Sequence, residues 1–279
     1  MAFLQVPQST IEENVFNALK EDVGEGDITA ELIPHDNISL ATVISRESCV
    51  FCGLDWFEET YRQIDEDILI DWCVDDGDNI EADQIICTIS GSSQKIVTGE
   101  RTALNFVQTL SATATLSARY ATAVADTKTK VLDTRKTIPG LRMAQKYAVS
   151  CGGCENHRLG LFDAFLIKEN HINACDGIQN AVNEARFHNP DMKVEVEVEN
   201  MDELQQAIDA GADRALLDNF DITALAQAVK TCKGKIISEA SGNITIESIS
   251  AVANTGVDYI STGALTKDIK AVDLSMRFD

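Results

Sequence analysis

Hydrophobic and polar positions follow two different patterns along the chain. From residue 130 onward, short apolar runs are separated by longer segments with helical spacing, which is typical of parallel β/α units. The predicted strands are 130–133, 164–167, 194–198, 214–217, 235–239 and 258–261. The predicted helices are 141–148, 178–186, 201–210, 222–231 and 246–254. Six strands are fewer than the eight of a closed (β/α)₈ barrel.

The first hundred residues have a different pattern. Alternating apolar and polar residues predict strands at 40–50, 68–72 and 85–91. Helices are predicted at 1–20, capped by Ser9 or Thr10, at 55–67 and from 99 to about 125. Between the last two strands, Asp76-Gly77 predicts a hairpin. Segment 74–80 is also similar to a biotinyl or lipoyl carrier domain, but it lacks the lysine that such a hairpin tip needs.

The charges are distributed unevenly. The chain has 23 Lys and Arg against 45 Asp and Glu, a net charge of −22. Residues 95–170 nevertheless hold eleven basic and six acidic residues, a local net charge of 11 − 6 = +5. Cations grouped near strand ends indicate an anionic small-molecule ligand. The acidic balance argues against nucleic acid and anionic membranes as partners, because both are polyanions.

The composition favours a cytoplasmic protein. No apolar run approaches the ~20 residues of a membrane span, and the first residues lack the pattern of a secretion signal. The eight cysteines are more typical of reduced thiols than of a disulfide scaffold. Cys49-x-x-Cys52 and Cys151-x-x-Cys154 suggest zinc or redox chemistry, but the pairs fall in different predicted domains, so we expect no structural metal.

Several motifs in order carry a family resemblance, which extends from about residue 21 to 278. They are DTRKTIPGLR at 133–142, KYAV-x-CGG-x-ENHR-x-GLFDAFLIK-x-NH at 146–171, VEVEVEN at 194–200, LLDNF at 216–220, EASGNIT at 239–245 and TGVDYISTGALT at 255–266. Together they resemble quinolinate phosphoribosyltransferase, the decarboxylating nicotinate-nucleotide pyrophosphorylase.

The resemblance implies a fold and an activity. The fold would be α/β: an N-terminal open-faced α/β sandwich, 1–103, and a C-terminal incomplete parallel α/β barrel, 104–267, with the run from about 268 to 279 returning to the first domain. The activity would be transfer of phosphoribose from phosphoribosyl pyrophosphate (PRPP) to quinolinate with decarboxylation. The products would be nicotinate mononucleotide, pyrophosphate and CO₂, in NAD biosynthesis.

Cations follow the first two predicted barrel strands. Planar guanidinium groups match paired carboxylates such as those of a pyridine dicarboxylate. The resemblance places on quinolinate the residues Arg101, Thr134, Arg135, Lys136, His157, Arg158 and Lys168. It also places Lys136 and Thr137 on PRPP. Taken alone, Arg135 and Lys136 could mark a surface turn, and a lone histidine such as His157 is often only a satisfied polar residue.

Carboxylates follow the middle strands. Glu195, Glu197 and Glu199 alternate along one strand and share a face. The resemblance assigns Glu197 and Asp218 to the ribose hydroxyls and to Mg²⁺ that accompanies PRPP, with no organic cofactor. Glu195 and Glu199 are expected to form salt bridges outside the ligand site.

Small residues follow the last two strands. Glycine lets backbone N–H groups approach a phosphate, as in the phosphate sites of many barrels. The predicted PRPP-binding residues here are Ser241, Gly242, Asn243, Thr262, Gly263 and Ala264. Many family members have glycine in place of Asn243 and histidine in place of Lys267, so Lys267 has no assigned role.

Arg101 stands apart from the other candidates. The resemblance implies that it enters the active site of the partner subunit in a homodimer with shared sites. We group it with Lys136, Glu197 and Asp218 as catalytic. A relative with a different substrate, of the molybdenum-transport-associated type, would be expected to have a different set of arginines. A non-catalytic phosphosugar-binding or metal-holding protein would not need Arg135, Arg158 and Lys168 together.

Overall fold

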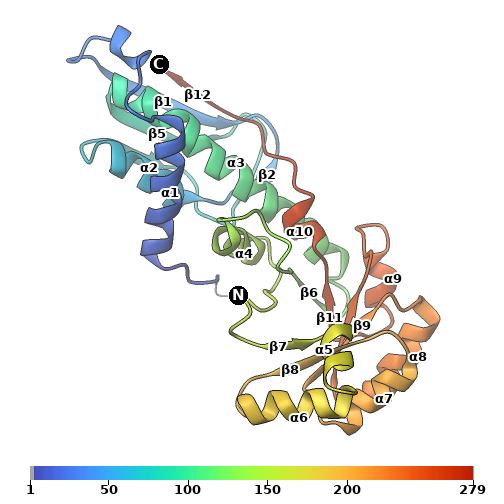
Figure 1. The fold of residues 1–279 in the computed structure, drawn as a ribbon. Coiled ribbons are helices and arrows are strands. Elements are labelled where there is room, and N and C mark those ends of the chain that lie inside the picture. Colours follow the sequence, from blue (N-terminus) through green and yellow to red (C-terminus); the bar gives the residue numbers. More distant parts are fainter. Residues whose placement is uncertain (1–2, 279) are drawn as a thin grey trace. The chain divides into compact units, whose positions relative to one another are not determined.

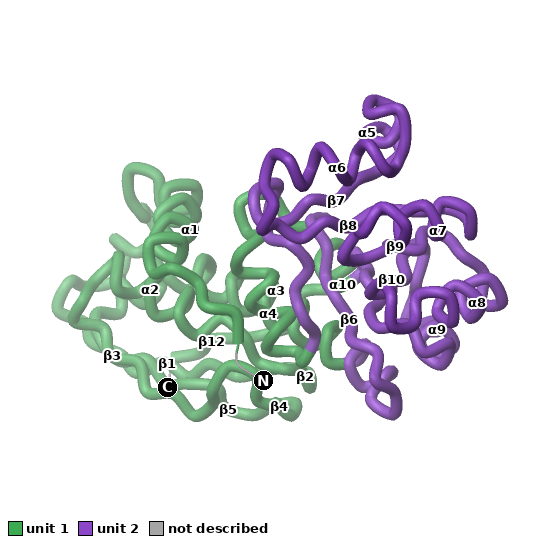
Figure 2. The backbone as a smooth tube through the Cα atoms, turned by 90° about the horizontal axis from the view of Figure 1, so that it is seen from below, with its two compact units in different colours: residues 1–118, 137–153, 265–279 green, residues 119–136, 154–264 purple. Residues whose placement is uncertain are grey.

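The computed structural model describes residues 3–278 and divides into two compact units (Figure 2). Unit 1 comprises residues 1–118, 137–153 and 265–279, and unit 2 comprises residues 119–136 and 154–264. The domain boundary drawn from the sequence, between residues 103 and 104, falls inside helix α3 (Ser93–Ala123). The predicted boundary concerns which parts of the chain fold independently, and it stays a prediction.

Unit 1 is built on a four-stranded antiparallel sheet with the order β12-β1-β5-β3 (Figure 1). Its strands are β1 (Ile38–Ser45), β3 (Leu69–Trp72), β5 (Ile85–Ser92) and β12 (Leu274–Phe278), so the C-terminal strand joins the sheet beside β1. The helices are α1 (Gln8–Asp22), α2 (Leu54–Ile64), α4 (Arg142–Cys151), most of α3 and the short η1 (Ala30–Leu32). Phe57, Tyr61 and Ile89 belong to the buried core between sheet and helices.

Two predicted details of the helices of unit 1 are wrong. Helix α1 is preceded by Pro7 and has no side-chain cap from Ser9 or Thr10. Helix α3 begins at Ser93, six residues before the predicted start. Gly99 therefore lies inside the helix, where a Cβ would be 2.6 Å from the Tyr61 ring, so this glycine permits the close packing of α2 on α3.

The predicted hairpin at Asp76-Gly77 is also wrong. Strand β4 (Asn79–Ile80) pairs with β2 (Cys49–Val50), not with β3. The Asp76 carboxylate accepts hydrogen bonds from the backbone of Gly53 (2.8 Å) and Leu54 (3.2 Å) at the start of α2. The Asp-Gly turn therefore serves the helix N-terminus, where free N–H groups need acceptors.

Unit 2 contains a six-stranded parallel sheet with the order β6-β11-β10-β9-β8-β7, so β6 and β7 are its two edges. Its strands are β6 (Lys130–Leu132), β7 (Phe165–Ile167), β8 (Val194–Val198), β9 (Arg214–Asp218), β10 (Ile237–Ser241) and β11 (Tyr259–Ser261). Its helices are α5 (Glu169–Ala174), α6 (Ile178–His188), α7 (Met201–Asp209), α8 (Ile222–Cys232) and α9 (Ile249–Ala253), and α10 (Ala264–Lys267) starts at its end. The unclosed parallel sheet agrees with the predicted incomplete barrel.

Two elements of unit 2 differ from the prediction. Strand β10 starts two residues later than predicted, because the N–H groups of Lys235 and Ile236 still bond to the Cys232 carbonyl at the end of α8. Helix α5 was missed, since it has six residues and no buried face. The shift of β10 places Glu239 in the middle of the strand and Ser241 at its end.

None of the helices in residues 3–278 is both long and apolar enough to cross a membrane. The cytoplasmic location stays a prediction.

Candidate active site

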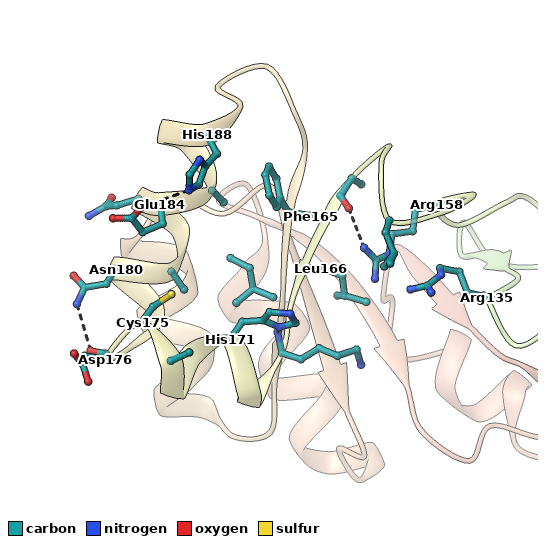
Figure 3. A pocket seen from close by; sticks show the side chains of 18 residues that line it. Arg135, Arg158, Phe165, Leu166, His171, Cys175, Asp176, Asn180, Glu184 and His188 are labelled. Atoms are coloured by element: carbon teal, nitrogen blue, oxygen red, sulfur yellow. Dashed lines mark hydrogen bonds and ion pairs between the residues drawn. The ribbon is translucent and has the colours of Figure 1, made fainter.

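Most predicted site residues of unit 2 lie at the carboxyl ends of its strands, which meet at one edge of a parallel sheet, whereas His157 and Arg158 lie in the loop before β7. Three cations from the ends of β6 and β7 and the intervening loop line one cavity of about 1050 Å³: Arg135, Arg158 and Lys168. In Figure 3, Arg135 and Arg158 lie at one end of this cavity, and Glu184 and His188 of α6 lie at the other. The cavity therefore has a cationic end suited to an anion.

Arg158 is half-buried and lies close to the charge of Arg135. Arg158 donates from Nη1 to the carbonyl of Ala164, just before β7, at 3.0 Å (Figure 3). Burial lowers the pKa of Arg158, and the charge of Arg135 lowers it further. An anion bound between the two guanidinium groups would relieve this repulsion.

Carboxylates occupy the ends of β8 and β9. Glu197 forms an ion pair with Lys168 across neighbouring strands. Asp218 ends β9, and its Oδ2 accepts from the Asn219 side chain at 2.7 Å. Sequence placed Lys168 on quinolinate and Glu197 on PRPP, and the two side chains are in direct contact in this structure.

The loop after β10 requires its glycine. Gly242 has a φ of +98°, and a Cβ there would lie 2.2 Å from Oδ1 and 2.9 Å from the backbone nitrogen of Asn219. The Asn219 N–H also donates to the Ser241 carbonyl at 3.0 Å. Asn243 adopts a φ of +49°, a left-handed conformation that asparagine tolerates better than most side chains.

The loop after β11 meets the loop after β6. Thr262 donates its N–H to the Leu132 carbonyl at 3.1 Å, and its Oγ1 accepts from the Ala264 N–H at 3.2 Å. A Cβ on Gly263 would lie 2.8 Å from Cδ of Lys136, so the lysine chain lies directly against this glycine. Lys136 and the small-residue loop are thus neighbours, as a shared phosphate ligand would require.

His157 is largely enclosed, with a side chain that is 10% exposed. Its backbone N–H donates to Oδ1 of the fully buried Asp133 at 2.9 Å, and its Nε2 lies 2.9 Å from Oε2 of Glu195. Glu195 was expected to form a salt bridge, and it does, with His157. That it lies outside the ligand site stays a prediction. Residue 195 shares its strand face with Glu197 but sits deeper, where His157 is its partner.

A second buried carboxylate lies beside this pair. Oε1 of Glu239 is 3.5 Å from Nε2 of His157, and its Oε2 accepts from Arg214 Nη1 at 2.7 Å. The Arg214 guanidinium stacks 4.4 Å from the centre of the Tyr259 ring. Burial raises the pKa of Glu195, and burial together with the Glu195 charge raises the pKa of Glu239 to about 7.

This pKa predicts a pH dependence of stability. The folded protein holds the Glu239 proton more tightly than the unfolded chain, whose ordinary value is 4.5, so the free energy of unfolding should fall as pH rises from about 4.5 to about 7. A shift of this size corresponds to about 3 kcal/mol. The free energy of unfolding can be measured by urea denaturation at several pH values between 5 and 8. Plotted against pH, it should fall less steeply for Glu239→Gln than for wild type. The exposed Glu184→Gln should keep the wild-type slope, and equal slopes for all three proteins would contradict the prediction.

Three further candidates belong to unit 1. Arg101 is exposed on α3, eight residues after its first residue, and Oγ1 of Thr137 accepts from Nε of Arg142 at 3.2 Å. Lys267, which has no predicted role, pairs with Asp268 at 3.1 Å.

The cysteine pairs lie differently from the expectation. Cys52 and Cys151, one from each pair, both belong to unit 1 and come within 4.8 Å of each other and of Asp76. The Asp76 oxygens already accept from Gly53, Leu54 and Tyr147, the last at 2.7 Å. Burial raises the pKa of Cys52 well above its ordinary value, which favours a neutral thiol. The absence of structural zinc stays a prediction.

Comparison with known proteins covers nearly the whole chain. Residues 27–111 match the family model for the N-terminal domain of quinolinate phosphoribosyl transferase, and residues 113–277 match that for its C-terminal domain. The chain belongs to the quinolinate phosphoribosyltransferase family. A Bacillus subtilis protein named probable nicotinate-nucleotide pyrophosphorylase is 39% identical over 257 residues, 92% of this chain and 89% of the relative. An Arabidopsis thaliana chloroplastic enzyme of the same name is 38% identical over 94% of this chain and 81% of its own.

Solved structures agree with this family. The nicotinate-nucleotide pyrophosphorylase of Francisella tularensis superimposes with a TM-score of 0.96 at 49% identity, covering 99% of this chain and 98% of the other. A Streptococcus pyogenes member gives 0.94 at 36% identity, with 98% of each chain covered. Both the antiparallel sheet of unit 1 and the six-stranded parallel sheet of unit 2 are therefore those of the quinolinate phosphoribosyltransferase family.

Sequence reasoning missed the residues beneath the strand ends. Asp133, Arg214 and Glu239 each stand in or beside a buried strand, where a charged residue is unusual unless it is paired. A charged residue in or beside an apolar strand was therefore the signal available in the sequence. The sequence does not show which residues pair with it.

Proposed function

We propose that this member of the family is a decarboxylating quinolinate phosphoribosyltransferase of NAD biosynthesis, a pentosyltransferase. The observation that carries the proposal is the cationic lining of one cavity, formed by Arg135, Arg158 and Lys168. Other strands of the same sheet end in two carboxylates and two glycine loops. Paired guanidinium groups suit a dicarboxylate, and glycine loops suit a phosphate.

The residues of unit 2 divide the two substrates between them. Arg135, Arg158, Lys168, Thr134 and His157 bind the quinolinate carboxylates. The 5′-phosphate of PRPP lies against the loops of residues 241–243 and 262–264. Lys136, which lies against Gly263, reaches the pyrophosphate.

The reaction needs orientation and charge more than a covalent nucleophile. The pyridine nitrogen forms a bond to C1 of the ribose with its lone pair while the bond from C1 to the pyrophosphate oxygen breaks. Positive charge that develops at C1 is stabilised by nearby carboxylates, and negative charge on pyrophosphate by Lys136 and Arg101. The quaternised nitrogen then stabilises the electron pair left at C2 when CO₂ departs, and this carbon takes up one proton.

Glu197 and Asp218 are the residues that would hold Mg²⁺ with PRPP. Each carboxylate has one oxygen engaged, by Lys168 and by Asn219, and Mg²⁺ typically takes one or two carboxylates together with substrate phosphates. The ion would offset charge on the pyrophosphate.

One assay tests the proposed function: quinolinate and PRPP are mixed with the protein, and nicotinate mononucleotide is followed by chromatography. A relative with another substrate would bind PRPP and release no nicotinate mononucleotide. A non-catalytic phosphosugar-binding protein would bind PRPP without releasing pyrophosphate. Either outcome would replace the proposal.

Metal dependence gives a separate prediction. Activity should vanish with EDTA, because Mg²⁺ accompanies PRPP in the proposed reaction. It should return with Mg²⁺ alone, because we expect no second metal at the buried thiols. Elemental analysis of the purified protein should show no stoichiometric zinc. One zinc per chain, lost in Cys151→Ser, would contradict this and would identify Cys52, Asp76 and Cys151 as a metal site.

A further inference from the structure

A buried hydrogen-bonded group extends from His157 into unit 2. The His157 side chain is 10% exposed, Glu195 8% and Glu239 0%. Each comes from a different element: the loop between α4 and β7, the strand β8 and the strand β10. Arg214 of β9 holds Glu239 from the other side at 2.7 Å and is itself stacked on Tyr259 of β11.

The strand register builds this group. Glu195 stands opposite Arg214 in the β8–β9 pairing, and Glu239 stands opposite Tyr259 in the β10–β11 pairing. Side chains two residues apart on a strand share a face, so Glu195 lies below Glu197 and Glu239 lies below Ser241. Four adjacent strands thus contribute one layer directly beneath the layer that carries the proposed PRPP-binding residues.

His157 is fixed at two points. Its main chain is held by Asp133, whose Oδ1 accepts from the His157 N–H at 2.9 Å and whose Oδ2 accepts from the Asn156 side chain at 2.7 Å. Its ring is held by Glu195 at 2.9 Å, with Glu239 next to it. An ionised Glu195 can only accept a hydrogen bond, and Nε2 then carries the hydrogen.

We propose that Glu195, supported by Glu239 and Arg214, is a positioning residue that fixes the ring orientation of His157 for quinolinate binding. The proposal rests on the proposed function, in which His157 and the adjacent Arg158 contact quinolinate. Glu195 itself lies too deep to share that ligand with them. Its effect passes through the ring, which cannot rotate without breaking the bond at Nε2.

Without the hydrogen bond to Glu195 the His157 ring can rotate, and the ligand must then fix the orientation of the ring when it binds. A hydrogen bond to a charged partner accounts for about a tenfold change in affinity. Removing it should weaken quinolinate binding by that factor and leave PRPP binding unchanged, because His157, the side chain that Glu195 holds, is assigned to quinolinate and not to PRPP.

The variants separate a positioning role from a purely structural one. Glu195→Met keeps the volume of the side chain but removes the acceptor, whereas Glu195→Gln keeps an oxygen that can accept from Nε2 and adds an amide that can donate to Glu239. Quinolinate KM and calorimetric Kd should rise about tenfold in Glu195→Met and stay within about twofold of wild type in Glu195→Gln. The PRPP constants should not change in either variant.

Nitrogen-15 NMR of the ligand-free protein provides a readout that does not depend on activity. The wild-type His157 spectrum should show hydrogen on Nε2, and that signal should shift in Glu195→Met. His188 pairs with the exposed Glu184 at 3.8 Å, so Glu184→Gln is the matched control and should leave the His157 signals in place.

Two results would overturn the proposal. One is a wild-type His157 that carries its only ring hydrogen on Nδ1, a measurement that stands even if Glu195→Met fails to fold. The other is equal quinolinate affinity in the Met, Gln and wild-type proteins. If wild type binds no quinolinate at all, the proposed function fails, and the NMR result still decides the ring orientation by itself.

Discussion

Arg135→Ala should abolish measurable quinolinate binding while PRPP binding stays intact. Arg135 lines the same cavity as Arg158, close enough for its charge to lower the pKa of that residue. A charge-assisted contact of a guanidinium with a carboxylate contributes roughly 1.5–3 kcal/mol, and stranding a buried carboxylate costs more. Affinity for the dicarboxylate should therefore fall by about a hundredfold or more, which removes the measurable binding.

Calorimetry with each ligand separately checks this expectation. Arg119→Ala is the matched control, because Arg119 is an exposed arginine of the same unit and is not among the predicted site residues. It should bind both ligands like wild type. Unchanged quinolinate affinity in Arg135→Ala would remove this residue from the site, and an equal loss of quinolinate and PRPP affinity would indicate a structural role.

The fold could be predicted where the chain repeats a simple pattern. In unit 2 each apolar run became a parallel strand, and polar residues directly after the runs came to one edge because parallel strands end together. This is why Arg135, Lys168 and Asp218 could be grouped before their positions were known. The same reasoning failed at the start of α3, where the decisive contact of Gly99 with the Tyr61 ring comes from another helix.

The layer beneath the strand ends was beyond the reach of sequence pattern. Glu195 could be placed on the same strand face as Glu197 from alternation alone, but its partner is 38 residues earlier in the chain. Glu239 was read as a strand end, because two residues that belong to the turn after α8 were counted in β10. An error of two residues in the bounds of one strand thus placed Glu239 at the strand end, and its part in the buried group was missed.

Arg101→Ala and Lys136→Ala should each be inactive, yet a mixture of the two should regain activity. Arg101 lies in unit 1, exposed on α3, whereas Lys136 lies in unit 2. Along α3 alone, the chain from Arg101 to Ala123 spans roughly 30 Å. We propose that Arg101 acts on the partner subunit in a homodimer, in which a two-fold interface completes both sites at once.

The amount of recovered activity tests this sharing. When the two variants are refolded together in equal amounts, about half of the dimers should be hybrids by random pairing. Each hybrid holds one complete site, with Lys136 from one chain and Arg101 from the other, so about a quarter of wild-type activity should return. A mixture of Lys136→Ala with Arg135→Ala is the control: both residues lie in unit 2, each hybrid site lacks one of them, and no activity should return. If mass spectrometry shows hybrids of Arg101→Ala and Lys136→Ala that remain inactive, Arg101 acts within its own chain or takes no part in the reaction.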